Sequence, residues 1–93
     1  MEAIMAVLLI TYDLKAPGRN YQPVYDYLKK FTYCKSMESV WLVDTTVSTG
    51  TIRDGLRGLV DGNDKIFVTR LAQDWASRNF ECGDWLNKPE RNW

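Results

Sequence analysis

The feature that most constrains the fold of this chain is an almost uninterrupted apolar run near its start. It spans Ile4 to Tyr12 (IMAVLLITY) and is closed by Asp13. Apolar and branched residues without alternation are typical of a strand buried on both faces of a sheet. The run is far shorter than the ~20 residues of a membrane-spanning helix, and Glu2 stands where a secretory leader carries basic residues. We therefore expect a central strand in a soluble, cytoplasmic protein that does not enter a membrane.

A turn and an amphipathic segment follow this strand. Pro17 and Gly18 redirect the chain, and Asn20 is a good N-cap residue for a helix. Apolar residues then recur at helical spacing up to Phe31 or Thr32. The pattern predicts a helix that lies on the sheet.

Residues 35–45 (KSMESVWLVDT) alternate between two faces. We place Met37, Trp41 and Val43 on one face, and a bend near Glu38 and Ser39 would divide the segment into two strands. Ser48 or Thr49 then caps a second helix whose apolar stripe is formed by Ile52, Leu56, Leu59 and Val60.

An Asp-Gly-Asn-Asp turn at 61–64 and a strand at 65–71 complete the pattern. Strand, helix, two strands, helix and strand in this order predict an α+β fold, the βαββαβ arrangement of the ferredoxin-like sandwich. We assign this domain to residues 1–71.

Residues 72–93 form an aromatic C-terminal extension with Trp75, Phe80, Trp85 and Trp93, and with a short helix at 83–88. Aromatic residues at this density are expected to be covered. We expect the extension to pack on the same domain or on a dimer partner.

The amino-acid composition argues against several classes of function. Twelve Lys and Arg balance twelve Asp and Glu, and histidine is absent. The neutral balance argues against coating long nucleic acid or a membrane, and the lack of histidine excludes His-dependent triads. Cys34 and Cys82 lie far apart without CxxC spacing, so we interpret both as reduced thiols of a cytoplasmic protein.

Short motifs carry a family resemblance over roughly residues 4–71. They are the strand end Leu9–Leu14 (LITYDL), the helix end Lys29–Phe31 and the strand start Ser39–Trp41. These motifs resemble the CRISPR-associated Cas-two family. The Tyr-Asp-Leu and Pro-Gly opening and the turn Asn63–Lys65 are more similar still to its small bacterial and phage relatives labelled SinR-like.

The resemblance implies a homodimer. For the CRISPR members it further implies a scaffold for spacer DNA, and for some a metal-dependent nuclease that uses the residue matching Asp13. Because the charge is neutral, the DNA scaffold is disfavoured here. The fold also hosts toxin-like ribonucleases, so fold alone does not choose a function.

Asp13 is the sharpest candidate for chemistry. Its carboxylate would hold Mg²⁺ in a nuclease, or it would accept hydrogen bonds from its own turn. The following loop has residues suited to an anion beside a helix N-terminus. The candidate ligand-binding residues are Tyr12, Lys15, Gly18, Arg19, Asn20, Ser39 and Trp75, with Tyr12 and Trp75 as possible stacking surfaces.

Three hypotheses for function follow. The first is a homodimer that binds a phosphate-bearing ligand, either short nucleic acid or a nucleotide, with sequestration of a cyclic nucleotide signal as one form. The second is a Mg²⁺-dependent nuclease that uses Asp13. The third is a non-catalytic protein-interaction module built on the aromatic extension.

Overall fold

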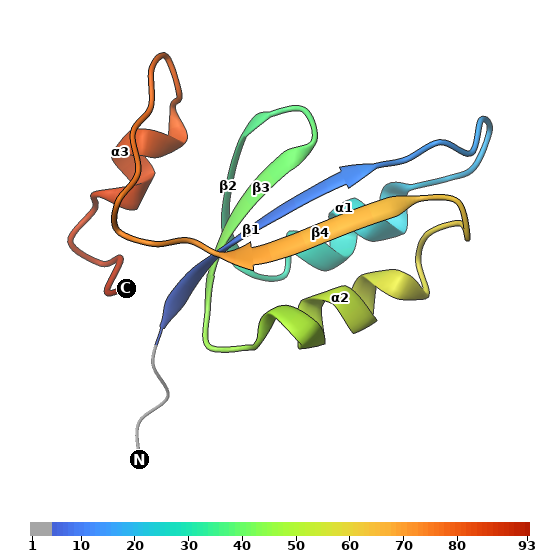
Figure 1. The fold of residues 1–93 in the computed structure, drawn as a ribbon, viewed down its shortest axis with the longest axis horizontal. Helices are drawn as coiled ribbons and strands as arrows, with labels where there is room; N and C mark the ends of the chain where they lie inside the picture. Colours follow the sequence, from blue (N-terminus) through green and yellow to red (C-terminus); the bar gives the residue numbers. More distant parts are fainter. Residues whose placement is uncertain (1–4) are drawn as a thin grey trace.

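The computed structural model describes residues 5–93, and the expected strand residue Ile4 lies outside them. Four strands form one antiparallel sheet in the order β2-β3-β1-β4 (Figure 1). The elements are β1 (Ala6–Asp13), α1 (Gln22–Leu28), β2 (Thr32–Met37), β3 (Val40–Thr45), α2 (Thr49–Arg57), β4 (Lys65–Arg70) and α3 (Cys82–Leu86). The chain is thus a mixed domain, compatible with the α+β class expected from its sequence.

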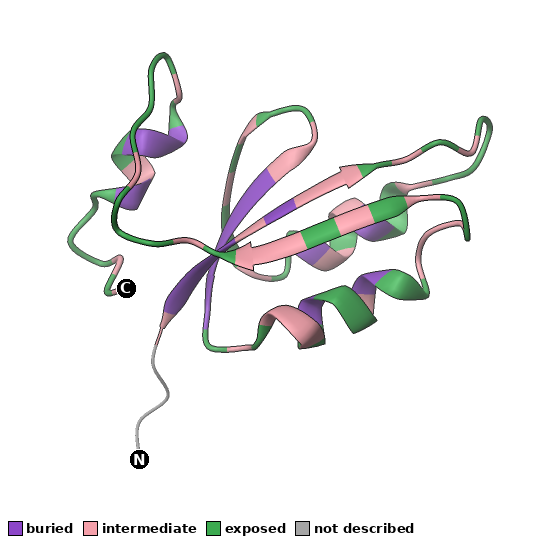
Figure 2. Ribbon diagram, in the orientation of Figure 1, coloured by how far each residue is buried: buried purple, intermediate pink, exposed green. Residues whose placement is uncertain are grey.

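β1 is an inner strand of this sheet, as its apolar run predicts. It pairs with β3 on one side and with β4 on the other, antiparallel to both. Val7, Leu8 and Ile10 are almost wholly buried although they alternate between the two faces. Buried side chains therefore lie on both faces of β1, in agreement with its continuous apolar pattern, and Figure 2 shows the buried residues in purple.

Two apolar cores lie on opposite faces of the sheet. The larger core, between the sheet and α1 and α2, contains Leu8, Ile10, Leu28, Trp41 and Ile52. The smaller core lies between the other face and the tail, and it contains Val7, Leu42, Cys82 and Leu86. Figure 1 shows α1 and α2 together on one side of the sheet, away from α3.

α1 and α2 pack on the sheet as the sequence predicts, but only α2 begins where expected. Ser48 caps α2 by accepting a hydrogen bond from the Thr51 backbone N–H at 3.1 Å. α1 begins later than expected, with Tyr21 at the N-cap position, while Asn20 Oδ1 accepts from the Gln22 N–H at 3.0 Å. Gly55 lets α2 approach α1, because a Cβ there would collide with the Tyr27 ring and its hydroxyl.

The pairing of β2 with β3 differs from the prediction in the face on which one residue, Met37, lies. The chain turns at Glu38 and Ser39 as expected, but β2 already begins at Thr32, because α1 ends at Leu28. A register irregularity between Cys34 and Met37 moves Met37 to the face that carries Leu42, so its expected place beside Trp41 is wrong.

The tail packs on the sheet of the same chain through covalent and ionic contacts. Cys34 and Cys82 form a disulfide with 5.8 Å between their Cα atoms, so the prediction of reduced thiols is wrong. The fold brings together two cysteines that lie far apart in the sequence. Arg91 makes a 3.0 Å ion pair with the buried carboxylate of Asp44 and stacks on Trp85. None of the described helices is long and apolar enough to cross a membrane.

Candidate functional site

The predicted site residues gather mainly at the end of the sheet where β1 ends. Asp13 lies opposite Lys65, the first residue of β4, and Thr11 lies opposite Val40, which follows the β2–β3 turn. The loop of residues 14–21 and the turn of residues 61–64 join the strands to α1 and α2 at this end. Because the end of β1 pairs with the starts of β3 and β4, the loop 14–21, the β2–β3 turn and the turn 61–64 lie at the same end of the sheet.

The carboxylate of Asp64 connects the loop 14–21 to the turn 61–64. Asp64 Oδ1 accepts a hydrogen bond from the Lys15 backbone N–H at 2.7 Å, and Oδ2 accepts from the Tyr21 hydroxyl at 2.7 Å. Oδ2 also accepts from the Asp61 backbone N–H at 2.8 Å, and the Tyr21 oxygen accepts from the Ala16 N–H at 3.1 Å. One side chain thus fixes the path of both segments.

The sequence predicted a turn at 61–64 but not this role for Asp64. The local signal was limited to an acidic residue in a turn, and two of its three hydrogen-bond donors, Lys15 and Tyr21, lie more than forty residues away. These hydrogen bonds shift the pKa of Asp64 and of Tyr21. Partial burial opposes ionisation of Asp64, but three hydrogen bonds to the carboxylate outweigh it and lower its pKa. Desolvation and the bond to this carboxylate raise the pKa of Tyr21.

The two basic residues of the loop lie on its surface, each beside a carboxylate. Lys15 Nζ is 3.3 Å from Asp13, with both side chains more than half exposed. The Arg19 guanidinium is 4.0 Å from Asp61 and 6.0 Å from the centre of the Tyr21 ring. Exposed pairs of this kind contribute about 0–1 kcal/mol. Either cation is therefore available to an anion that binds at the loop.

Backbone conformation fixes the form of this loop. Gly18 has φ +78°, a left-handed conformation that residues with a Cβ rarely adopt. The Arg19 N–H donates to the Ala16 carbonyl at 3.2 Å and closes the turn. Gly18 is thus needed for the turn, and Asn20 supports the chain that enters α1 through its side-chain bond to Gln22.

The remaining predicted site residues are Tyr12, Ser39 and Trp75, and only Trp75 lies away from the end of β1. Tyr12 packs against the helix-side core, where its hydroxyl accepts a 3.0 Å bond from Trp41 Nε1, and burial raises its pKa. Ser39 is half-buried in the β2–β3 turn at the same end of the sheet as Asp13. Trp75 packs with the smaller core on the opposite face. The structure therefore gathers Asp13, Lys15, Gly18, Arg19 and Asn20, but it does not bring Trp75 to them.

The magnesium site that the resemblance implies would rest on the carboxylate of Asp13. Mg²⁺ takes octahedral oxygen ligands, which proteins supply mainly as carboxylates and waters. Asp13 has an ammonium group beside it. Within residues 5–93 no group of three or more His, Cys, Asp or Glu residues is placed to hold a metal. We derive no catalytic step through a metal here.

No family model matches the chain, and no solved structure matches it. The function therefore has to be argued from the site itself.

Proposed function

We propose that this chain is a ferredoxin-like, Cas-two-like homodimer that binds a phosphate-bearing ligand at the end of β1. The succession β1, α1, β2, β3, α2, β4 and the sheet order β2-β3-β1-β4 support the ferredoxin-like assignment. An exposed apolar side chain on edge strand β4, Phe67, supports association with a second copy.

One observation carries the ligand proposal: a pair of exposed cations stands on a loop whose path is already fixed. Lys15 and Arg19 lie on the loop 14–21, which Asp64 ties to the turn 61–64. A loop that is ordered before binding loses less conformational entropy when it captures an anion. The arrangement suits a phosphate group held by two charged side chains.

The charge balance favours a small ligand. Lys15, Arg19 and Lys65 lie close to Asp13, Asp61 and Asp64, so this end of the sheet carries no excess positive charge. A long nucleic acid depends on many phosphate contacts, whereas a nucleotide or a short oligonucleotide needs few. Within this proposal, a cyclic nucleotide is a suitable ligand, and its sequestration would need no catalytic group.

The decisive experiment uses the ion pair between Lys15 and Asp13. Nucleotides, cyclic nucleotides and short oligonucleotides are titrated by calorimetry into the protein and its variants. Asp13→Asn removes the carboxylate that competes for Lys15, so we expect phosphate ligands to bind about two- to fivefold more tightly. Lys15→Ala removes a charged donor and should weaken binding about tenfold.

The same variants separate this proposal from the nuclease. A Mg²⁺-dependent nuclease would lose cleavage of RNA or DNA in Asp13→Asn, whereas a binding protein shows no cleavage to lose. Lys88→Ala, in the tail after α3, is the matched control and should leave binding unchanged. Equal affinity for phosphate ligands in Lys15→Ala, Arg19→Ala and the unaltered protein would contradict the proposal.

We also propose the cytoplasmic location expected from composition, although the disulfide removes one argument for it. Disulfides persist mainly in oxidising compartments. Fractionation of cells, with thiol labelling of Cys34 and Cys82 in each fraction, tests the location and the state of the bond together. Recovery of the oxidised protein only outside the cytoplasm would overturn this part.

A further inference from the structure

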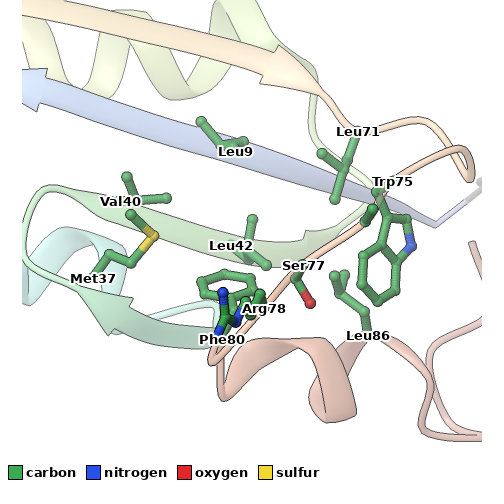
Figure 3. Close-up of a pocket in the computed structure, with 11 residues that line it drawn as sticks. Leu9, Met37, Val40, Leu42, Leu71, Trp75, Ser77, Arg78, Phe80 and Leu86 are labelled. Carbon is green, nitrogen blue, oxygen red and sulfur yellow. The ribbon is translucent and has the colours of Figure 1, made fainter.

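A concave apolar groove lies on the face of the sheet that α1 and α2 leave free. Its floor is formed by Leu9, Val40 and Leu42 on β1 and β3, and its volume is about 430 Å³. The strap, residues 72–81 between β4 and α3, forms the opposite wall with Trp75 and Phe80 (Figure 3). The groove is separate from the loop that we propose for phosphate.

The strap is fixed at both of its ends. On the β4 side, the Leu71 N–H donates to the Val7 carbonyl at 2.8 Å and continues the pairing of the sheet. On the α3 side, the disulfide joins Cys82 to Cys34 on β2. Close packing between the strap and α3 adds to this, since a Cβ on Gly83 would lie 3.0 Å from Ser77 Oγ. The groove is therefore held between two anchored ends.

The lining of the groove is apolar except for two side chains of the strap. The apolar side chains come from three strands, the strap and α3. Ser77 and Arg78 are the polar side chains, and both are exposed. Among residues 5–93, no carboxylate lies within ion-pair distance of the Arg78 guanidinium. The groove thus combines apolar walls with one cation that has no internal counter-ion.

We propose that this groove binds a small amphipathic acid, a molecule with an apolar body and a single anionic head. Ligand sites in proteins commonly measure ~300–1,000 Å³ and combine apolar walls with a few polar groups. The apolar body would contact Leu9, Leu42 and Trp75, and Arg78 would form charge-assisted hydrogen bonds with the head. The charge of Arg78 favours such an acid over a neutral apolar molecule.

The test compares probes that differ only in the head. Decanoate, decanol and decyltrimethylammonium, each below its micellar concentration, compete with the fluorescent anion 1-anilinonaphthalene-8-sulfonate. We expect decanoate to bind about tenfold more tightly than decanol and the cation to bind weakest. Arg78→Gln should abolish the preference for decanoate and leave the affinity for decanol unchanged.

Two further variants locate the binding. Ala76→Trp places a large side chain against the groove and should reduce the binding of decanoate and decanol alike. Arg70→Gln, at the end of β4 outside the lining, should change neither. Chemical shifts of the unaltered protein on adding decanoate should move at Leu9, Leu42 and the Trp75 indole, with little change at Trp41 in the other core.

The outcomes that overturn the proposal are distinct. Equal affinity for decanoate and decanol, or unchanged decanoate binding in Arg78→Gln, would contradict the proposal that the ligand is an acid. A change of oligomeric state in Ala76→Trp would show that a second copy covers the groove instead. The phosphate titrations depend on Lys15 and Arg19, which lie outside the groove. A negative result for one site therefore does not contradict the proposal for the other.

Discussion

At the scale of single residues, Asp64 makes the stability of the loop 14–21 depend on pH. Hydrogen bonds from Lys15, Tyr21 and Asp61 lower the pKa of its carboxyl below the ordinary value of 3.8. A pKa that is lower in the folded state stabilises the fold above the unfolded value, and this contribution disappears as the pH falls through the folded value.

We expect Asp64→Asn to lower the melting temperature at neutral pH, because an amide cannot accept every bond that the carboxylate accepts. The difference from the unaltered protein should shrink as the pH is lowered from about 7 to about 2.5. Thermal unfolding monitored by circular dichroism over this range measures it. Asp74→Asn, in the strap, is the control and should show no such trend. A constant difference at all pH values would contradict a role for the ionised carboxylate.

Residue roles could be predicted from the sequence where they depend on neighbours along the chain. Ser48 as a cap, Gly18 in a turn and Trp41 in the core follow from local pattern. The bonds of Asp64 to Lys15 and Tyr21, and the buried pair of Asp44 with Arg91, join residues over forty positions apart, so spacing carries no signal for them.

At the scale of elements, the disulfide joins the tail to the strand at the edge of the sheet. Cys34 on β2 and Cys82 at the start of α3 close a loop with a sequence separation of 48. Closing a loop of this length restricts the unfolded chain and is expected to stabilise the fold by about 4 kcal/mol. β2 and α3 are thereby coupled, although 48 positions separate the two cysteines in the sequence.

Reduction of the bond, or the double change Cys34→Ala and Cys82→Ala, should lower the free energy of unfolding by about this amount. Urea unfolding with and without reductant measures the loss. The double variant is also the control, since reductant should not affect it. If the unaltered protein unfolds at the same urea concentration in both conditions, the bond does not form in solution or does not stabilise the fold.

The sequence predicted the kind and order of the elements better than their ends. The uninterrupted apolar run located β1, the helical stripe located α2, and the turn at 61–64 located the start of β4, but β2 began three residues before the alternation became clear. The irregularity before Met37 reversed its face, which no periodic pattern shows. The course of the tail across the sheet depends on the smaller core and the disulfide, and neither could be read from spacing.

At the scale of the whole molecule, the sheet has a helix-covered face and a face that the tail covers only in part. Among the exposed large apolar side chains, Phe67 on β4 is 62% exposed and Met37 on β2 is 52% exposed. β4 is also an edge strand, with backbone groups on one side unpaired by this sheet. Phe67 lies outside the groove lining, so association through β4 and occupation of the groove are separate events.

The homodimer that we propose should form through β4 and Phe67. Sedimentation velocity should therefore give twice the chain mass of 10.8 kDa for the unaltered protein. Phe67→Lys should shift it to a single chain without loss of the folded state, because an exposed side chain contributes little to the core. Lys88→Gln, exposed in the tail after α3, is the control and should leave the dimer intact. A single chain at all concentrations of the unaltered protein would contradict the dimer, whereas a dimer that persists in Phe67→Lys would show association through another surface.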